Sequence, residues 1–118
     1  MQAVTDLAPK ASIWFERHGS YLLGDQESRL LEAIDQVGSI KEAAKTAGIS
    51  YRTAWARLQE MERALGHPVV KSRAGGPGGG ATTLTDETRR LLRFYREVSA
   101  RSVADVEREF QTALQLDR

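Results

Sequence analysis

Apolar side chains recur every three or four residues in three consecutive segments between residues 25 and 65, with polar side chains between them. This spacing places the apolar residues of each segment on one face of a helix. The three faces comprise Leu30, Leu31, Ile34 and Val37, then Ile40, Ala43, Ala44 and Ala47, and finally Ala54, Leu58, Met61 and Leu65. The pattern therefore predicts three short amphipathic helices.

Residues at the ends of these segments predict where each helix starts and stops. Asp25 can cap the first helix, Ser39 begins an S-x-x-E capping box at the second, and Ser50 can cap the third. A glycine follows each segment, as at many helix C-termini. The second and third helices are joined by AGIS, residues 47–50, and two short helices joined by such a turn form a helix-turn-helix.

Two pairs of strand-like segments accompany these helices. Residues 12–23 alternate in part between apolar and polar side chains and contain a turn signal at residues 18–20, which predicts a β-hairpin. The β-branched segments 68–73 and 81–85 flank the glycine-rich stretch 75–80. A strand, a tip and a strand directly after a helix-turn-helix predict a wing.

The C-terminal part of the chain is expected to form one long helix. Asp86 and Glu87 suit its first turn, and no glycine or proline follows them. A helix of about 30 residues cannot bury its whole apolar stripe on so small a domain, so we expect it to pair with its copy in a second subunit. The alternative is packing on the N-terminal hairpin of its own chain. The residues expected at the dimer interface are Leu92, Tyr95, Val103, Val106, Phe110 and Leu114.

These elements together predict a mainly α fold with small β elements. It is a winged helix-turn-helix with an N-terminal β-hairpin and a long C-terminal dimerisation helix. Residues 11–85 are expected to form the hairpin and the DNA-binding domain, and residues 86–118 the dimerisation helix.

The composition argues against several classes of protein. The 118 residues contain no cysteine and two separated histidines, so neither a disulfide framework nor a metal site is expected. The stretch GGPGGGAT, residues 75–82, has nearly the spacing of a nucleotide-binding P-loop, but Ala81 occupies the lysine position and no helix is expected directly after it. We therefore predict no enzyme activity, no cofactor and no small-molecule site. With no signal-peptide pattern and no long apolar run, a cytoplasmic protein is expected.

The net charge of +1 is unevenly distributed along the chain. Residues 41–73 carry seven basic and three acidic side chains, a net charge of +4, whereas residues 1–40 carry −3 and residues 74–118 are balanced. A local positive field attracts polyanions such as nucleic acid.

The third predicted helix carries most of the candidate DNA contacts. Arg52 can reach guanine or a phosphate, Thr53 can meet a base edge or a thymine methyl, and the small Ala56 permits close approach to a major groove. Tyr51 can reach a phosphate through its hydroxyl or remain solvated, and Trp55 is expected to pack in a structural seam. The full set expected to contact DNA is Ser39, Lys41, Ser50, Tyr51, Arg52, Thr53, Ala56, Arg57, Lys71, Arg73, Gly76, Gly78 and Gly79.

These same residues resemble a known family. GSIKEAAKTAGISYRTAWARLQEME, then VVKSRAGGPGGGATTLT, then a long helix are similar to the N-terminal DNA-binding domain of the molybdate-dependent transcriptional regulators, the ModE family. More distantly they resemble the LysR-type winged helix-turn-helix. The resemblance covers residues 13–110 and implies a homodimeric repressor or activator that binds a partly palindromic operator near molybdenum uptake or cofactor genes. It places residues 50–53 and Arg57 in the recognition helix, and Arg73 with residues 75–80 in the wing.

Two alternative hypotheses assume the same fold but assign it a different function. An architectural DNA-binding protein would lack sequence preference, and a protein-interaction module would make the local positive charge incidental. The family's sensor modules, which bind the oxyanion, have no counterpart in these 118 residues, so the resemblance fits either a one-domain member or a fragment.

Overall fold

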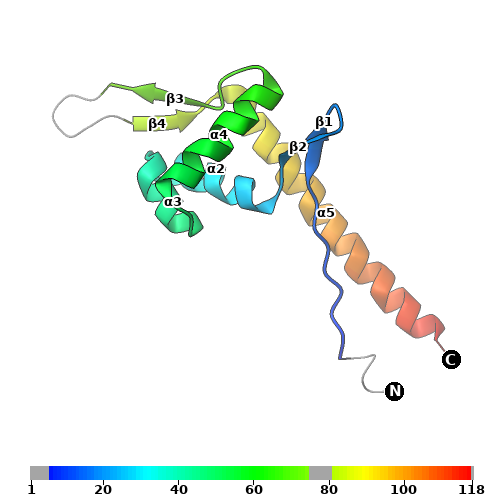
Figure 1. Cartoon of the computed structure of the whole chain (residues 1–118). Coiled ribbons are helices and arrows are strands. Elements are labelled where there is room, and N and C mark those ends of the chain that lie inside the picture. Colours follow the sequence, from blue (N-terminus) through cyan, green and yellow to red (C-terminus); the bar gives the residue numbers. More distant parts are fainter. Residues whose placement is uncertain (1–5, 75–80, 118) are drawn as a thin grey trace.

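The computed structural model describes residues 6–74 and 81–117, and within them the predicted order of elements is confirmed. A β-hairpin precedes three helices, a second strand pair follows them, and one long helix ends the chain (Figure 1). The elements are β1 (Phe15–Arg17), β2 (Ser20–Leu23), α2 (Asp25–Val37), α3 (Ile40–Ala47), α4 (Tyr51–Leu65), β3 (Val70–Arg73), β4 (Ala81–Leu84) and α5 (Asp86–Leu116). The fold is a winged helix-turn-helix, as the sequence predicted.

The start of α2 differs from the prediction by one residue. Gly24, and not Asp25, is the N-cap, because the side chain of Glu27 reaches back and its Oε1 accepts the Gly24 backbone N–H at 2.9 Å. This bond satisfies a donor that the helix itself cannot pair. Asp25 instead occupies the first turn and forms an exposed ion pair with Arg29 at 2.9 Å.

The caps of the next two helices are confirmed. Ser39 Oγ accepts the Glu42 backbone N–H at 3.2 Å, and Ser50 Oγ accepts the Thr53 backbone N–H at 3.0 Å. Gly48 ends α3 with φ of 74°, a left-handed conformation that glycine adopts without strain. The turn between α3 and α4 is therefore specified by interactions within a few residues of it.

The core lies where α2, α3 and α4 meet the two strand pairs and the first turns of α5. Most of the predicted inner-face residues are buried, and Leu30, Leu31 and Ile34 of α2 are fully buried. Ala47 and Leu65 are half-buried, and Val37, in the last turn of α2, is 47% exposed. Leucines from β2 and β4 also enter this core, so both strand pairs are attached to the helices by apolar contact.

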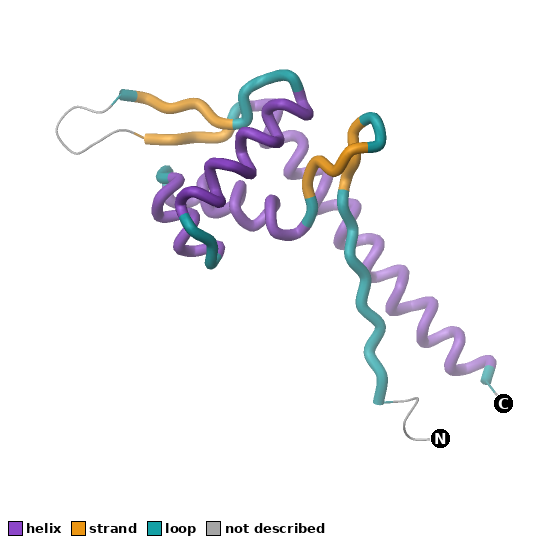
Figure 2. The backbone as a smooth tube through the Cα atoms, in the orientation of Figure 1, coloured by secondary structure: helices purple, strands orange, loops and turns teal. Residues whose placement is uncertain are grey.

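The wing extends from the body as two antiparallel strands (Figure 2). Their register runs from Val70 opposite Leu84 to Arg73 opposite Ala81. Strand β4 is tied to the turn between α2 and α3, because the Thr82 backbone N–H donates to the Gly38 carbonyl at 2.9 Å. This hydrogen bond fixes the position of the wing strands relative to the helix-turn-helix.

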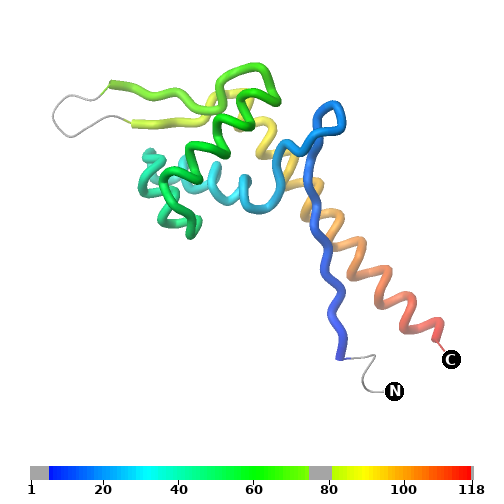
Figure 3. The backbone as a smooth tube through the Cα atoms, in the orientation of Figure 1, coloured from blue at the N-terminus to red at the C-terminus, as the bar shows by residue number. Residues whose placement is uncertain are grey.

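Helix α5 leaves the body, and the N-terminal segment accompanies it. Figure 3 shows the segment before β1 running beside the C-terminal half of α5. Residues 7–10 line one hollow together with side chains near Phe110. The molecule is accordingly elongated, with principal extents of 67 × 31 × 21 Å. Among the described residues, none of the helices has both the length and the hydropathy that crossing a membrane requires.

Replacing Leu58 by Ala tests the attachment of α4 to the core. Leu58 is 1% exposed, so we expect the free energy of unfolding to fall by about 2–5 kcal/mol. The neighbouring Gln59→Ala change, on the exposed face, should alter it by less than about 0.5 kcal/mol. Urea unfolding followed by circular dichroism measures both. Equal losses in the two variants would contradict this placement of α4.

Candidate nucleic-acid interface

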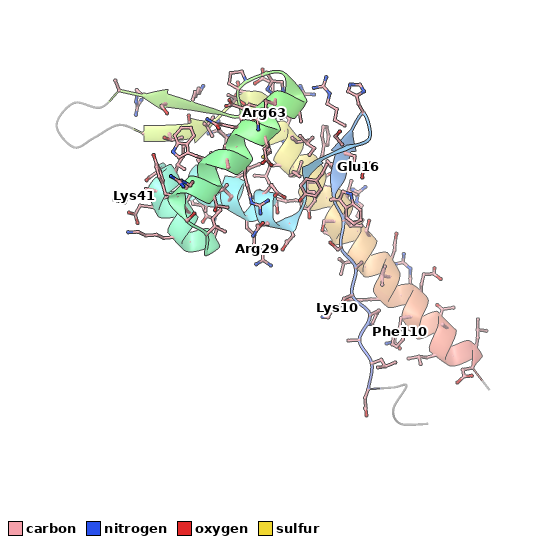
Figure 4. The ribbon with its side chains drawn as sticks, viewed as in Figure 1. Lys10, Glu16, Arg29, Lys41, Arg63 and Phe110 are labelled. Atoms are coloured by element: carbon pink, nitrogen blue, oxygen red, sulfur yellow. The ribbon has the colours of Figure 1, made fainter. Side chains whose placement is uncertain are left out.

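Helix α4 presents one polar face to solvent. Ala54, Leu58 and Met61 are buried on the opposite face, as the sequence predicted. Arg52, Ala56, Gln59 and Arg63 are all exposed. Figure 4 marks Arg63 on this helix and Lys41 on the neighbouring α3. The exposed face therefore combines cationic and amide side chains with a small residue at its centre.

The first turn of α4 is ordered by its own hydroxyl groups. Ser50 Oγ donates to Thr53 Oγ1 at 2.9 Å while it accepts the Thr53 backbone N–H. Thr53 is half-buried, whereas Ser50, Tyr51 and Arg52 are exposed around the same helix start. A helix N-terminus carries partial positive charge, which favours a phosphate there.

Two aromatic side chains cover one flank of this turn. The rings of Tyr51 and Trp55 pack edge to face, with centroids 6.2 Å apart and an interplanar angle of 85°. Tyr51 is 52% exposed and Trp55 37% exposed. Trp55 is thus the less accessible of the pair, and the prediction that it packs in a structural seam is met only by its contact with Tyr51.

Lys41 and Ser39 lie at the start of α3, close in sequence but different in role. Lys41 is exposed. Ser39 is half-buried and its hydroxyl oxygen already caps the helix. Of the two residues predicted here, Lys41 is the freer to meet a phosphate.

The described part of the wing offers two cations on one strand. Lys71 and Arg73 are exposed and two residues apart on β3, a spacing that places them on the same face of the strand. With Ala81 and Thr83 of β4 they line a hollow of about 330 Å³. The predicted contacts Gly76, Gly78 and Gly79 lie outside the described residues.

Arg57, a predicted DNA contact, has an ion-pair partner within its own chain, and its contact with DNA stays a prediction. Its guanidinium donates to Glu27 Oε2 at 2.7 Å, and the Glu27 side chain is 3% exposed. The same carboxylate accepts the Tyr21 hydroxyl and the Gly24 backbone N–H. The charge of Arg57 is therefore directed inward to this carboxylate, and the residue holds α4 against α2 and the hairpin.

The electrostatics of Glu27 follow from these contacts. Burial by itself raises the pKa of this carboxyl group, but the hydrogen bonds from Tyr21 and Gly24 and the charge of Arg57 outweigh it and hold the pKa below the ordinary value of 4.5. Burial and the hydrogen bond to Glu27 raise the pKa of Tyr21. Glu27 is thus ionised and Tyr21 protonated at neutral pH.

The roles of Glu27 and Tyr21 were not predicted from the sequence. A weak signal was present for Glu27, which lies three, four and seven residues before Leu30, Leu31 and Ile34 and so shares their inward face. A glutamate in the first turn of a helix is usually explained by the helix dipole alone. Tyr21 offered no comparable signal, since its partner is set by tertiary packing.

Two of the predicted dimer contacts belong to the core of their own chain. Leu92 is 3% and Tyr95 4% exposed. The Tyr95 hydroxyl donates to the Ile13 carbonyl at 2.9 Å, and its ring packs edge to face on Phe15 with centroids 5.4 Å apart. These two residues are therefore corrected to intrachain contacts, because both belong to the hydrophobic core of their own chain.

The second half of the stripe remains accessible. Val103 is 37% exposed, and Val106, Phe110 and Leu114 are half-buried. The use of this distal stripe of α5 as a dimer interface stays a prediction.

Comparison with known proteins gives a family and several relatives. Residues 26–89 match the bacterial regulatory helix-turn-helix proteins of the lysR family. The molybdenum transport protein ModE of Azotobacter vinelandii is 42% identical over 92 residues, which cover 78% of this chain and 31% of that protein. The molybdenum-pterin-binding protein MopB of Rhodobacter capsulatus is 38% identical over 102 residues, covering 86% and 37%.

A third relative has a regulatory name. The DNA-binding transcriptional dual regulator ModE of Escherichia coli K12 is 44% identical over 66 residues, covering 56% of this chain and 25% of that protein. The chain thus spans between a quarter and two fifths of the length of these curated relatives.

The buried carboxylate generates a pH-dependent prediction. Because the folded pKa of Glu27 lies below 4.5, its contribution to stability is complete above pH 4.5 and is lost as the pH falls through the folded pKa. Glu27→Gln should lower the free energy of unfolding at pH 7 by about 1–3 kcal/mol, and the deficit should shrink in acid. Urea unfolding at a series of pH values measures this.

A matched control lies on the same helix. Glu32 pairs with Arg96 at 2.7 Å, but both side chains are nearly half exposed. Glu32→Gln should therefore cost less than about 1 kcal/mol. A deficit for Glu27→Gln that stays constant from pH 7 to pH 3 would contradict the role assigned to the ionised carboxylate.

Proposed function

The chain belongs to the lysR family of bacterial regulatory helix-turn-helix proteins, and from this premise we propose that it is a sequence-specific DNA-binding regulator of transcription. The observation that carries the proposal is the solvent-facing side of α4, where exposed Arg52 and Ala56 follow an exposed, capped helix start. A helix of this form fits the major groove with its N-terminal residues nearest the bases.

Each residue of this face has a chemical role in the proposal. Arg52 donates to the acceptor edge of guanine, and Ala56 leaves room for the groove edge. Thr53, coupled to Ser50, holds the first turn and offers its methyl group to thymine. Tyr51 reaches a backbone phosphate through its hydroxyl, supported by its packing on Trp55.

A second set of residues fixes the register on the duplex. Lys41, Lys71 and Arg73 are exposed cations on α3 and β3, and strand β4 of the wing is tied to the turn that precedes α3. In the proposal these side chains meet phosphates, which add affinity without sequence information.

The relatives suggest which genes are regulated. Two are named for molybdenum transport or for molybdenum-pterin binding, and one is named as a DNA-binding transcriptional dual regulator. We propose that this chain controls molybdenum-related genes from the bacterial cytoplasm. The architectural alternative predicts DNA affinity without sequence preference, and the protein-interaction alternative predicts no measurable DNA affinity.

The proposed regulator acts as a homodimer through the distal half of α5. This half extends away from the core (Figure 1), and Val103 lies exposed on the same stripe as the half-buried Phe110. Apolar stripes on protruding helices are commonly covered by a symmetric copy. Two copies of α4 would then enter major grooves about 34 Å apart on one face of the duplex.

Two substitutions separate base contact from phosphate contact. A site is first selected from random duplexes with the wild-type protein, and affinities are then measured by fluorescence anisotropy. Arg52→Ala should lower affinity for the selected site by about 1–3 kcal/mol and leave random DNA nearly unaffected. Lys71→Ala should weaken both and reduce the salt slope by about one.

The control for both changes is Arg93→Ala, which removes an exposed cation from α5. It should leave both affinities nearly unchanged. Failure of the wild-type protein to bind DNA at low salt, or binding without a steep salt dependence, would overturn the proposed function.

Sedimentation velocity tests the dimer. Val103→Asp places a charge on the exposed stripe, so we expect the variant to sediment as a monomer at concentrations where the wild type is dimeric. Thr112→Asp places the same charge on the opposite face of α5, where it is exposed, and should leave the dimer intact. A wild type that is monomeric at every concentration, or an unaffected Val103→Asp variant, would overturn the proposed interface.

A further inference from the structure

The N-terminal hairpin contacts the end of the helix proposed to enter DNA. Arg17, at the end of β1, donates from one guanidinium nitrogen to the Ala64 carbonyl at 2.9 Å and to the Leu65 carbonyl. These carbonyls belong to the last turn of α4, where helix geometry provides no partner. A cation there also complements the helix dipole. Figure 1 shows the hairpin beside this end of the helix.

The hairpin makes a second, indirect contact further along the same helix. Tyr21 of β2 donates its hydroxyl to Glu27, and Glu27 accepts Arg57 of α4 at 2.7 Å. Arg57 and Ala64 are about two helical turns apart. Helix α4 is thus held by the hairpin at its middle and at its C-terminal end.

These contacts with the hairpin limit a rotation of α4 that its apolar packing alone would allow. The fully buried face of α4 consists of Ala54, Leu58 and Met61, a narrow stripe about which a helix can rock. Hydrogen bonds depend on both distance and direction, so two of them on one flank resist that rotation. Base discrimination requires side chains to be held within about 0.5 Å of the productive geometry.

The hairpin is also separate from the part of the chain that defines the family. The match to the lysR family starts at residue 26, whereas the hairpin ends at Leu23. Arg17 is exposed and lies outside the hydrophobic core. Its two bonds therefore act on the orientation of α4 more than on the existence of the fold.

We propose that the hairpin sets the orientation of α4 on DNA, with Arg17 and Tyr21 as positioning residues for base discrimination. The inference rests on the proposed DNA-binding function and deepens it. Neither residue touches DNA in this proposal, and both act through the backbone or the side chains of α4.

The test compares affinities for the selected site and for random duplex DNA, at a temperature where circular dichroism shows every variant folded. Arg17→Gln removes the cation, and Tyr21→Phe removes only the hydroxyl that meets Glu27. Each should lower the ratio of the two affinities by about tenfold, because base contacts are misplaced while phosphate contacts persist. Arg17→Lys should restore most of the ratio, since an ammonium group can donate to the same carbonyls.

Arg93→Gln is the matched control, because it removes an exposed cation from α5 with the same substitution. It should leave the ratio unchanged. An Arg17→Gln variant with a lower unfolding temperature but an unchanged ratio would overturn the positioning role, as would an equal loss of both affinities, which identifies Arg17 as a phosphate contact.

Other outcomes are also decisive. If Arg17→Gln does not fold, the Tyr21→Phe variant provides the test. An unchanged ratio of the affinities for the selected site and for random DNA in that variant overturns the inference. If the wild-type protein itself shows no preference among DNA sequences, the proposed function fails and the inference fails with it. If the wild-type protein prefers the selected site over random DNA and the hairpin variants show the same preference, the proposed function is supported and the inference is overturned.

Discussion

The arrangement of this protein depends on the buried carboxylate of Glu27. It accepts the backbone N–H that starts α2, the hydroxyl of Tyr21 from the hairpin and the guanidinium of Arg57 from α4. An ionised carboxylate removed from water without partners would be destabilising by several kcal/mol, so these donors offset a large penalty together. The contact ties three elements to one point, and the apolar core packs around it.

This contact also determines what α4 leaves for a partner. With Arg57 directed inward, the exposed face is left to Arg52, Ala56 and Arg63. The positive charge of residues 41–73 is therefore less available than the sequence suggests, because one of its seven cations is neutralised by a carboxylate from outside the segment. The remaining cations lie on α3, α4 and β3, and the hydrogen bond from Thr82 to Gly38 holds the wing strands in a fixed relation to the start of α3.

Helix α5 serves two purposes along its length. Its first turns complete the core, where Tyr95 meets Ile13 and Phe15. Its distal half extends beyond the body beside the N-terminal segment, with an apolar stripe that the body does not cover. Phe15 of the hairpin contacts α5 at Tyr95, and Arg17 of the same hairpin contacts α4. One short element thus bears on both the proposed dimer helix and the proposed recognition helix.

The amino-acid sequence by itself determined the helices, their glycine stops, the Ser39 and Ser50 caps and the pairing of the wing strands. These features arise from periodicity and from contacts a few residues apart, so they are visible in a linear sequence. Tertiary structure decided the roles of Arg57 and Tyr95, whose partners lie 30 and 82 residues away. A polar side chain on the flank of a helix has the same pattern whether it meets DNA or a buried carboxylate. Its role is settled by which distant group the folded chain brings within hydrogen-bonding distance.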